Sequence, residues 1–92
     1  MSAHVIVEFT IQSAEGMSEY GAAAAETFIP FQGEFVSKGK NEVLHGEGAH
    51  AMKAIISFPD TDSARRWYNS DAYQALIPMR NKAMNSRFEL IV

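Results

Sequence analysis

Three segments of the chain, residues 4–10, 52–58 and 87–92, carry apolar residues at every second position. Successive side chains of a β-strand point to opposite faces of the sheet, so residues two apart share a face. The shared apolar face is built from Val5, Val7, Phe9, Ala54, Ile56, Phe58, Phe88, Leu90 and Val92. A sheet with one wholly apolar face must be covered by another layer. This requirement limits the fold more than any other feature of the sequence.

The opposite face of these three segments mixes isoleucine with ionisable residues. Its members are His4, Ile6, Glu8, Lys53, Ile55, Ser57, Arg87, Glu89 and Ile91. One explanation is a solvated face with surface ion pairs, each worth about 0–1 kcal/mol. The other is a homodimer in which two such faces close around a partly polar interior. Ile6, Ile55 and Ile91 favour the homodimer, because an exposed apolar patch marks an interface.

The cover for the apolar face is predicted to be two helices. Ser13 can cap the first, whose apolar stripe has helical spacing and consists of Met17, Tyr20, Ala24, Phe28 and Phe31. Pro30 should end or bend this helix near residue 29, and Gly33 is a plausible terminator.

The second helical region is expected to start after residue 58, with Asp60 or Thr61 as its cap. Residues 69–71 interrupt it, and Ser70 can cap the continuation. Pro78 lies inside that continuation and should kink it.

The remaining segments complete the topology. Residues 34–38 are expected to form the second strand, followed by a turn at 38–41 and a flexible glycine-containing connection at 45–48. The order strand-helix-strand-strand-helix-strand predicts an α+β fold, the ferredoxin-like sandwich, in which an antiparallel sheet carries both helices on one face. We expect residues 1–92 to form this single domain.

Composition narrows the partners and the location. The net charge of −3 and the scattered lysines and arginines argue against nucleic acid. The sequence contains no cysteine, and no signal peptide or membrane span is recognisable, so we expect a cytoplasmic protein with no membrane contact. The histidines His4, His45 and His50 do not have the spacing of metal ligands, and neither a metal nor a cofactor is expected.

The sequence resembles the domain-of-unknown-function-1330 family over nearly its whole length. The motifs that carry the resemblance are Phe58-Pro59-Asp60, Ala64-Arg65-Arg66-Trp67-Tyr68-Asn69-Ser70, Tyr73-Gln74-Ala75-Leu76-Ile77-Pro78 followed by Arg80, and Ser86-Arg87-Phe88. The segments 4–8 and 33–35 fit the same pattern, whereas Gln32-Gly33 and Asp71-Ala72 depart from it in minor ways. That family belongs to the dimeric α/β-barrel superfamily, so the resemblance implies two sheets paired face to face with the helices outside. It implies no substrate.

Candidate catalytic residues lie on the mixed face. Glu8 is the acid/base candidate, with His4 and Arg87 expected beside it, and a structural ion pair is the simpler interpretation of the same residues.

Candidate ligand-binding residues are Lys53, Ser57, Tyr68, Tyr73 and Arg80. Packing at the helix edge is the simpler role for the two tyrosines, and Arg80 could either anchor an acidic ligand or solvate its helix.

These residues support three hypotheses. The first is a homodimeric domain that binds a small organic molecule, and acts on it as a cofactor-free enzyme through acid/base chemistry. The second is a non-catalytic dimeric binding or regulatory module. The third is a purely structural dimer whose interior is filled by its own side chains.

Overall fold

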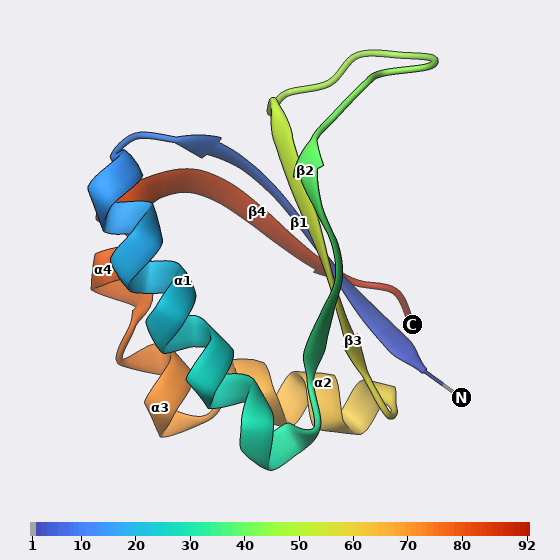
Figure 1. The fold of residues 1–92 in the computed structure, drawn as a ribbon. Coiled ribbons are helices and arrows are strands. Elements are labelled where there is room, and N and C mark those ends of the chain that lie inside the picture. The colour runs from blue at the N-terminus through green and yellow to red at the C-terminus, as the bar shows by residue number, and fades with distance from the viewer. Residues whose placement is uncertain (1) are drawn as a thin grey trace.

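The computed structural model describes residues 2–92 as a twisted sheet with helices on one side (Figure 1). In chain order the elements are β1 (Ala3–Ile11), α1 (Ala14–Phe28), the 3-10 helix η1 (Ile29–Phe31), β2 (Glu34–Lys40), β3 (Met52–Phe58), α2 (Thr61–Tyr68), α3 (Asp71–Gln74), α4 (Ile77–Ala83) and β4 (Met84–Leu90). The predicted α+β order is confirmed, and the second helical region consists of three short helices.

The sheet has four strands in the order β2-β3-β1-β4, and every neighbouring pair is antiparallel. The central strand β1 pairs along most of its length with both β3 and β4. Glu8 is therefore directly opposite Lys53 on one side and Arg87 on the other. The predicted ferredoxin-like arrangement is confirmed, and β2 and β4 are its two edge strands.

The helices cover the apolar face, and the core lies between the two layers. Trp67 of α2 is fully buried at the centre of this core. Its ring lies 4.5 Å from that of Tyr73, 5.2 Å from that of Phe58 and 5.3 Å from that of Phe28, measured between centroids. The indole N–H donates a hydrogen bond of 2.9 Å to Thr27 on α1. Trp67 thus joins the sheet to helices from both halves of the chain.

The predicted helix caps are confirmed. The Ser13 hydroxyl accepts a hydrogen bond from the backbone N–H of Gly16, and the Asp60 carboxylate accepts one from Ser63 at 2.7 Å. The Ser70 hydroxyl accepts one from Tyr73 at 3.2 Å. Each side chain satisfies a backbone donor that the first turn of a helix leaves free.

Two of the predictions that rest on proline and glycine need correction. Pro78 does not kink a helix, because it lies in the first turn of α4, where a missing backbone donor costs nothing. Gln32, with a φ of 58°, takes the left-handed conformation that ends η1. Gly33 has another role, because a Cβ atom there would lie 2.5 Å from the Phe58 ring.

The strand bounds also differ in places. The expected turn at 38–41 is wrong, since β2 continues to Lys40 and the chain turns in the loop 41–51, which extends beyond the sheet (Figure 1). The last strand starts earlier than predicted, at Met84, and ends at Leu90.

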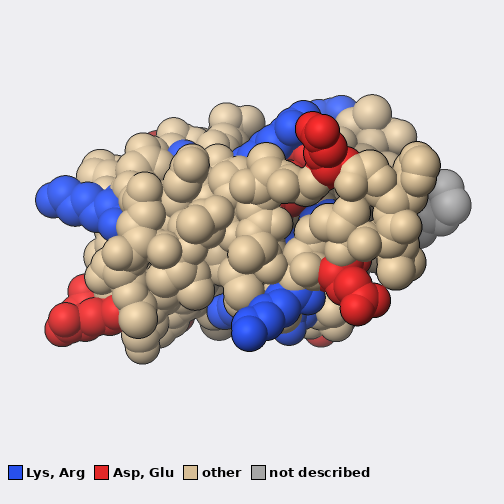
Figure 2. All heavy atoms as spheres, turned by 90° about the horizontal axis from the view of Figure 1, so that it is seen from above, with Lys and Arg blue, Asp and Glu red and all other residues tan. Residues whose placement is uncertain are grey.

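The face of the molecule shown in Figure 2 is mostly uncharged, and the basic and acidic side chains visible on it are interspersed without forming a broad patch of one sign. No helix within residues 2–92 is both long enough and apolar enough to cross a membrane.

Candidate functional site

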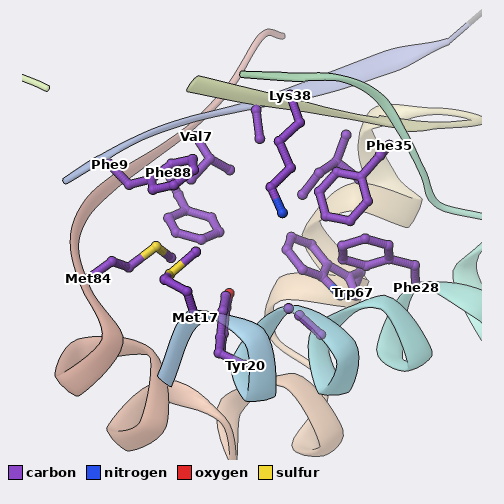
Figure 3. Close-up of a pocket in the computed structure, with 14 residues that line it drawn as sticks. Val7, Phe9, Met17, Tyr20, Phe28, Phe35, Lys38, Trp67, Met84 and Phe88 are labelled. Carbon is purple, nitrogen blue, oxygen red and sulfur yellow. The ribbon is translucent and has the colours of Figure 1, made fainter. Parts of the chain in front are cut away.

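A cavity lies between α1 and the helix-covered face of the sheet (Figure 3). With its open mouth included, the cavity has about 410 Å³ of empty space. The centre of a water-sized sphere can move within about 40 Å³ of it. This is room for a few water molecules, since one requires roughly 10–15 Å³ on the same measure. The wall is almost wholly apolar and includes the rings of Phe9, Phe28, Phe35, Trp67 and Phe88 and the thioethers of Met17 and Met84.

The cavity exists because small residues face each other across the two layers. Gly21 and Ala24 of α1 and Ala54 of β3 all contribute to its wall. Their side chains are too short to fill the space between the helix and the sheet. A core of this size is normally packed with few voids larger than a water molecule, so a gap between its two layers is a feature to explain.

A β-bulge in β2 brings a lysine to the mouth of the cavity. Phe35 is opposite Ile56 and Lys38 is opposite Ala54, with the register shifting between residues 35 and 37. Val36 is therefore an extra, unpaired residue, and both Phe35 and Lys38 lie on the helix-covered face of the sheet. In a regular strand these two would point to opposite faces. Figure 3 shows the amino group of Lys38 directed into the space between Phe88 and Trp67.

Three tyrosines and one arginine meet where the four helices converge. The hydroxyl oxygens of Tyr20 and Tyr73 are 2.8 Å apart. Nη1 of Arg80 donates to the hydroxyls of Tyr68 at 3.1 Å and Tyr73 at 3.2 Å. The guanidinium also lies over the Phe88 ring, 5.0 Å from its centroid. We call these four residues the tyrosine–arginine cluster, and Tyr20 is the member that lines the cavity.

The electrostatics of this cluster keep Tyr20 and Tyr73 protonated, so their hydroxyl groups can donate hydrogen bonds. Burial raises the pKa of Tyr20 far above its ordinary value, and the neighbouring Tyr73 adds to the effect. Burial also raises the pKa of Tyr73, although hydrogen bonds with Tyr20 and Arg80 oppose this. Burial disfavours the charge of Arg80, but its hydrogen bonds to Tyr73 and Tyr68 outweigh burial and raise the pKa of Arg80. At neutral pH both tyrosines are therefore uncharged phenols beside a permanent cation.

The structure places the other predicted residues on the uncovered face of the sheet. Glu8 forms an ion pair with Lys53 at 3.5 Å, and His4 is opposite Ser57 in the register. Arg87 pairs with Glu89 of its own strand at 3.4 Å, although Glu8 is its cross-strand neighbour. These residues are separated from the cavity by the thickness of the sheet.

The predicted residues thus divide into two groups. Tyr68, Tyr73 and Arg80 come together in the tyrosine–arginine cluster, whereas the candidates from the strands gather on the uncovered face. Sequence reasoning missed Tyr20, which it assigned only to an apolar stripe, and Lys38, which it placed where the second strand ends and the turn begins. The small residues at positions 21 and 24, on the same helix as Tyr20, were the available signal for a gap.

Residues 2–92 contain no group of three His, Asp or Glu side chains that could hold a metal ion.

Comparisons with solved structures show the same fold. A protein of unknown function from Rhodopseudomonas palustris aligns with a TM-score of 0.78 and 17% identity over 98% of this chain and 80% of that one. SnoaB, a cofactor-independent oxygenase from Streptomyces nogalater, aligns with a TM-score of 0.71 and 17% identity over 99% and 91%. A dimeric ferredoxin-like protein of unknown function from Jannaschia sp. CCS1 aligns with a TM-score of 0.68 and 13% identity over 100% and 99%.

The sequence itself identifies the family. No curated protein matches the chain. The family model described as domain of unknown function (DUF1330) matches residues 2–92, which is nearly the whole chain and includes all the strands and helices described above. The chain therefore belongs to the DUF1330 family.

Proposed function

We propose that the protein is a homodimeric domain that binds a small, mostly apolar organic molecule in the cavity beneath α1. The observation that carries the proposal is the gap itself, which opens between α1 and the sheet beside a core that is closely packed around Trp67. Ligand sites in proteins are typically concave, apolar and aromatic, with a few polar groups that fix orientation. The cavity has this composition.

The ligand must widen the cavity as it enters, because the present space holds only a few water molecules. The movable part of the wall is the edge strand β2. Phe35 is 42% exposed, and Lys38 has a flexible exposed side chain. β2 has no strand on its outer side, so displacing these two side chains breaks no strand pairing.

The homodimer is supported by the uncovered face of the sheet. Ile6 and Ile55 are direct cross-strand neighbours at its centre and are only partly buried in the single chain. Ile91 at its edge is 59% exposed. Burial of these side chains against a second copy would remove apolar surface from water, which is favourable. The fold relatives from Jannaschia and from Thermobifida fusca are both described as dimeric.

The neutral fluorescent probe N-phenyl-1-naphthylamine tests the cavity. We expect its fluorescence to rise on binding and the Ala24→Leu variant, which fills the gap, to bind it at least tenfold more weakly. Ala22→Leu is the matched control, since Ala22 is exposed on the same helix and does not line the cavity. If Ala24→Leu does not fold, Gly21→Leu replaces it, because a Cβ atom at Gly21 meets nothing within 4 Å. Equal binding by the cavity and control variants would overturn the proposed site.

Sedimentation analysis tests the homodimer. We expect the protein to sediment with a mass twice the 10.2 kDa of one chain. The Ile55→Lys variant should sediment as a monomer, because the new charge would be buried in the interface. Ile29→Lys is the control, since Ile29 is 72% exposed away from that face. A monomeric parent protein would refute the pairing.

Catalysis without a cofactor is the second candidate, and the Glu8–Lys53 ion pair favours it. This carboxylate lies at the centre of the uncovered face, which a second copy would enclose. SnoaB, which shares the fold, is a cofactor-independent oxygenase. The test is oxygen uptake with a panel of phenolic compounds. Uptake by the parent protein that is lost in Glu8→Gln supports catalysis, and no uptake, or equal uptake by both, contradicts a role for Glu8.

A further inference from the structure

We infer that the molecule bound beneath α1 carries an anionic oxygen on a planar apolar frame. This inference rests on the proposed function and adds the chemical class of the ligand. It follows from an imbalance in hydrogen bonding, because the polar groups around the cavity offer more donor hydrogens than the described residues have acceptors to receive them.

Lys38 is the first of these donors and is the one charged residue among those that line the cavity. No carboxylate within residues 2–92 lies within 4 Å of its amino group, whereas Lys53 has Glu8 as a partner. Its nearest aromatic ring is Phe35, whose centroid is 5.4 Å away. An ammonium over an apolar cavity loses hydration when a ligand covers it, so an uncharged ligand would bind there at a cost. An anionic ligand would remove that cost by pairing with it.

The second donor belongs to the hydrogen-bonded pair Tyr20 and Tyr73 of the tyrosine–arginine cluster. Arg80 can only donate, so the hydroxyl oxygen of Tyr73 accepts its hydrogen bond. One hydrogen serves the 2.8 Å contact between Tyr73 and Tyr20, and the other hydroxyl hydrogen of this pair has no acceptor among the described residues.

The position of the spare hydrogen follows from burial and polarisation. Tyr73 is fully buried, while Tyr20 lines the cavity. Tyr73 donating to Tyr20 is the orientation in which the hydrogen bonds run in one direction from Arg80, and it leaves the spare hydrogen on Tyr20, the member of the pair that lines the cavity. Successive hydrogen bonds that run in one direction strengthen each other. Arg80 is therefore a positioning residue, which acts on the ligand through the two hydroxyls.

The wall defines the rest of the ligand. Aromatic rings and two methionines surround the space, and both prefer to pack against flat polarisable groups. A planar frame with an acidic oxygen would place its body between these side chains and its charge within reach of Lys38 and Tyr20. Aromatic carboxylates and phenolates are the simplest members of this class.

A matched pair of probes tests the inference by calorimetry. 2-Naphthoate and 2-naphthamide have the same shape and differ in charge. We expect the parent protein to bind 2-naphthoate roughly tenfold more tightly, which corresponds to one hydrogen bond to a charged group. Lys38→Met should reduce this preference to about twofold to threefold, and any effect on entry into the cavity is shared by both probes and cancels in their ratio.

The hydrogen-bond chain has its own variants. Tyr20→Phe and Arg80→Gln should each lower the preference for 2-naphthoate by about twofold to threefold. Tyr68→Phe is the control, because Tyr68 contacts the same guanidinium but does not line the cavity. A purely structural role for Arg80 would weaken all three probes together, which would contradict its role as a positioning residue.

The outcomes separate the two proposals. If N-phenyl-1-naphthylamine does not bind, or binds equally to the cavity-filling and control variants, the cavity itself is not the site and the proposed function fails. If that probe binds in the cavity but 2-naphthoate and 2-naphthamide bind equally, the proposed function stands and the inference about charge is overturned.

Discussion

The two faces of the sheet have the same alternating pattern but differ in what covers them. On the helix-covered face, Val5, Val7 and Phe9 of β1 are all buried. On the other face, the intervening His4, Ile6 and Glu8 are only partly buried, and the ion pairs are partly exposed. The first face holds the fold together without a partner. The second mixes isoleucine with ionisable side chains and is the face that we propose a second copy covers, and the predictions below test this difference.

The largest effect is expected from the centre of the helix-covered face. Trp67→Ala should reduce the free energy of unfolding by about 3–5 kcal/mol, because it removes a fully buried indole and leaves a cavity. Urea denaturation measures this free energy. Leu44→Ala is the control, because Leu44 is 89% exposed in a loop, and its free energy of unfolding should stay within about 0.5 kcal/mol of that of the parent protein. Similar losses from both variants would mean that Trp67 is not the centre of the core.

An intermediate effect is expected at alkaline pH. Burial raises the pKa of Tyr20 and Tyr73 in the folded protein, so above pH 10 the unfolded chain loses these protons while the folded chain retains them. Stability should then fall with rising pH, by up to about 1.4 kcal/mol per pH unit for each tyrosine. Thermal melts between pH 8 and pH 11 measure the slope, which the double variant Tyr20→Phe/Tyr73→Phe should reduce. An unchanged slope would show that the two hydroxyls are accessible to water.

The smallest effect is expected on the uncovered face. Glu8→Gln removes the ion pair with Lys53, in which the Glu8 side chain is 27% exposed and that of Lys53 is 37% exposed. In the monomeric Ile55→Lys background, this loss should reduce the free energy of unfolding by less than about 1 kcal/mol. Added salt should reduce this cost further. In the parent protein, a second copy over the pair should make the cost larger and less sensitive to salt. Denaturation of both backgrounds at low and high salt compares them, and identical results would indicate that this face stays in water.

Much of the fold could be predicted because the signals are local. The third strand was predicted with its observed bounds, Met52–Phe58, since strict alternation between turn residues defines a strand. Ser13, Asp60 and Ser70 were correctly identified as caps because a capping side chain lies only three residues from the N–H it satisfies. The predicted kink at Pro78 was wrong. A proline is tolerated in the first turn of a helix and bends or breaks the helix further in, and the sequence did not show that one helix ends at residue 74 and another begins at residue 77.

The candidate site could be predicted only in part, because its residues meet through tertiary packing. Tyr68, Tyr73 and Arg80 were singled out one by one, yet their common hydrogen bonds depend on the bends between α2, α3 and α4. Tyr20 joins them from a different helix, 53 residues before Tyr73. The face occupied by Lys38 could not be obtained from alternation, because the bulge at Val36 reverses it.

The bulge in β2 also bears on how members of this family tolerate changes in length. Val36 pairs with no residue of β3 and is 57% exposed, so a chain that lacks it would join Phe35 directly to Ser37 in regular pairing. Lys38 would then keep its face and its neighbour Ala54. A one-residue gap at Val36 or at Ser37 in an aligned homologue would remove the bulge and would therefore be silent for the lysine.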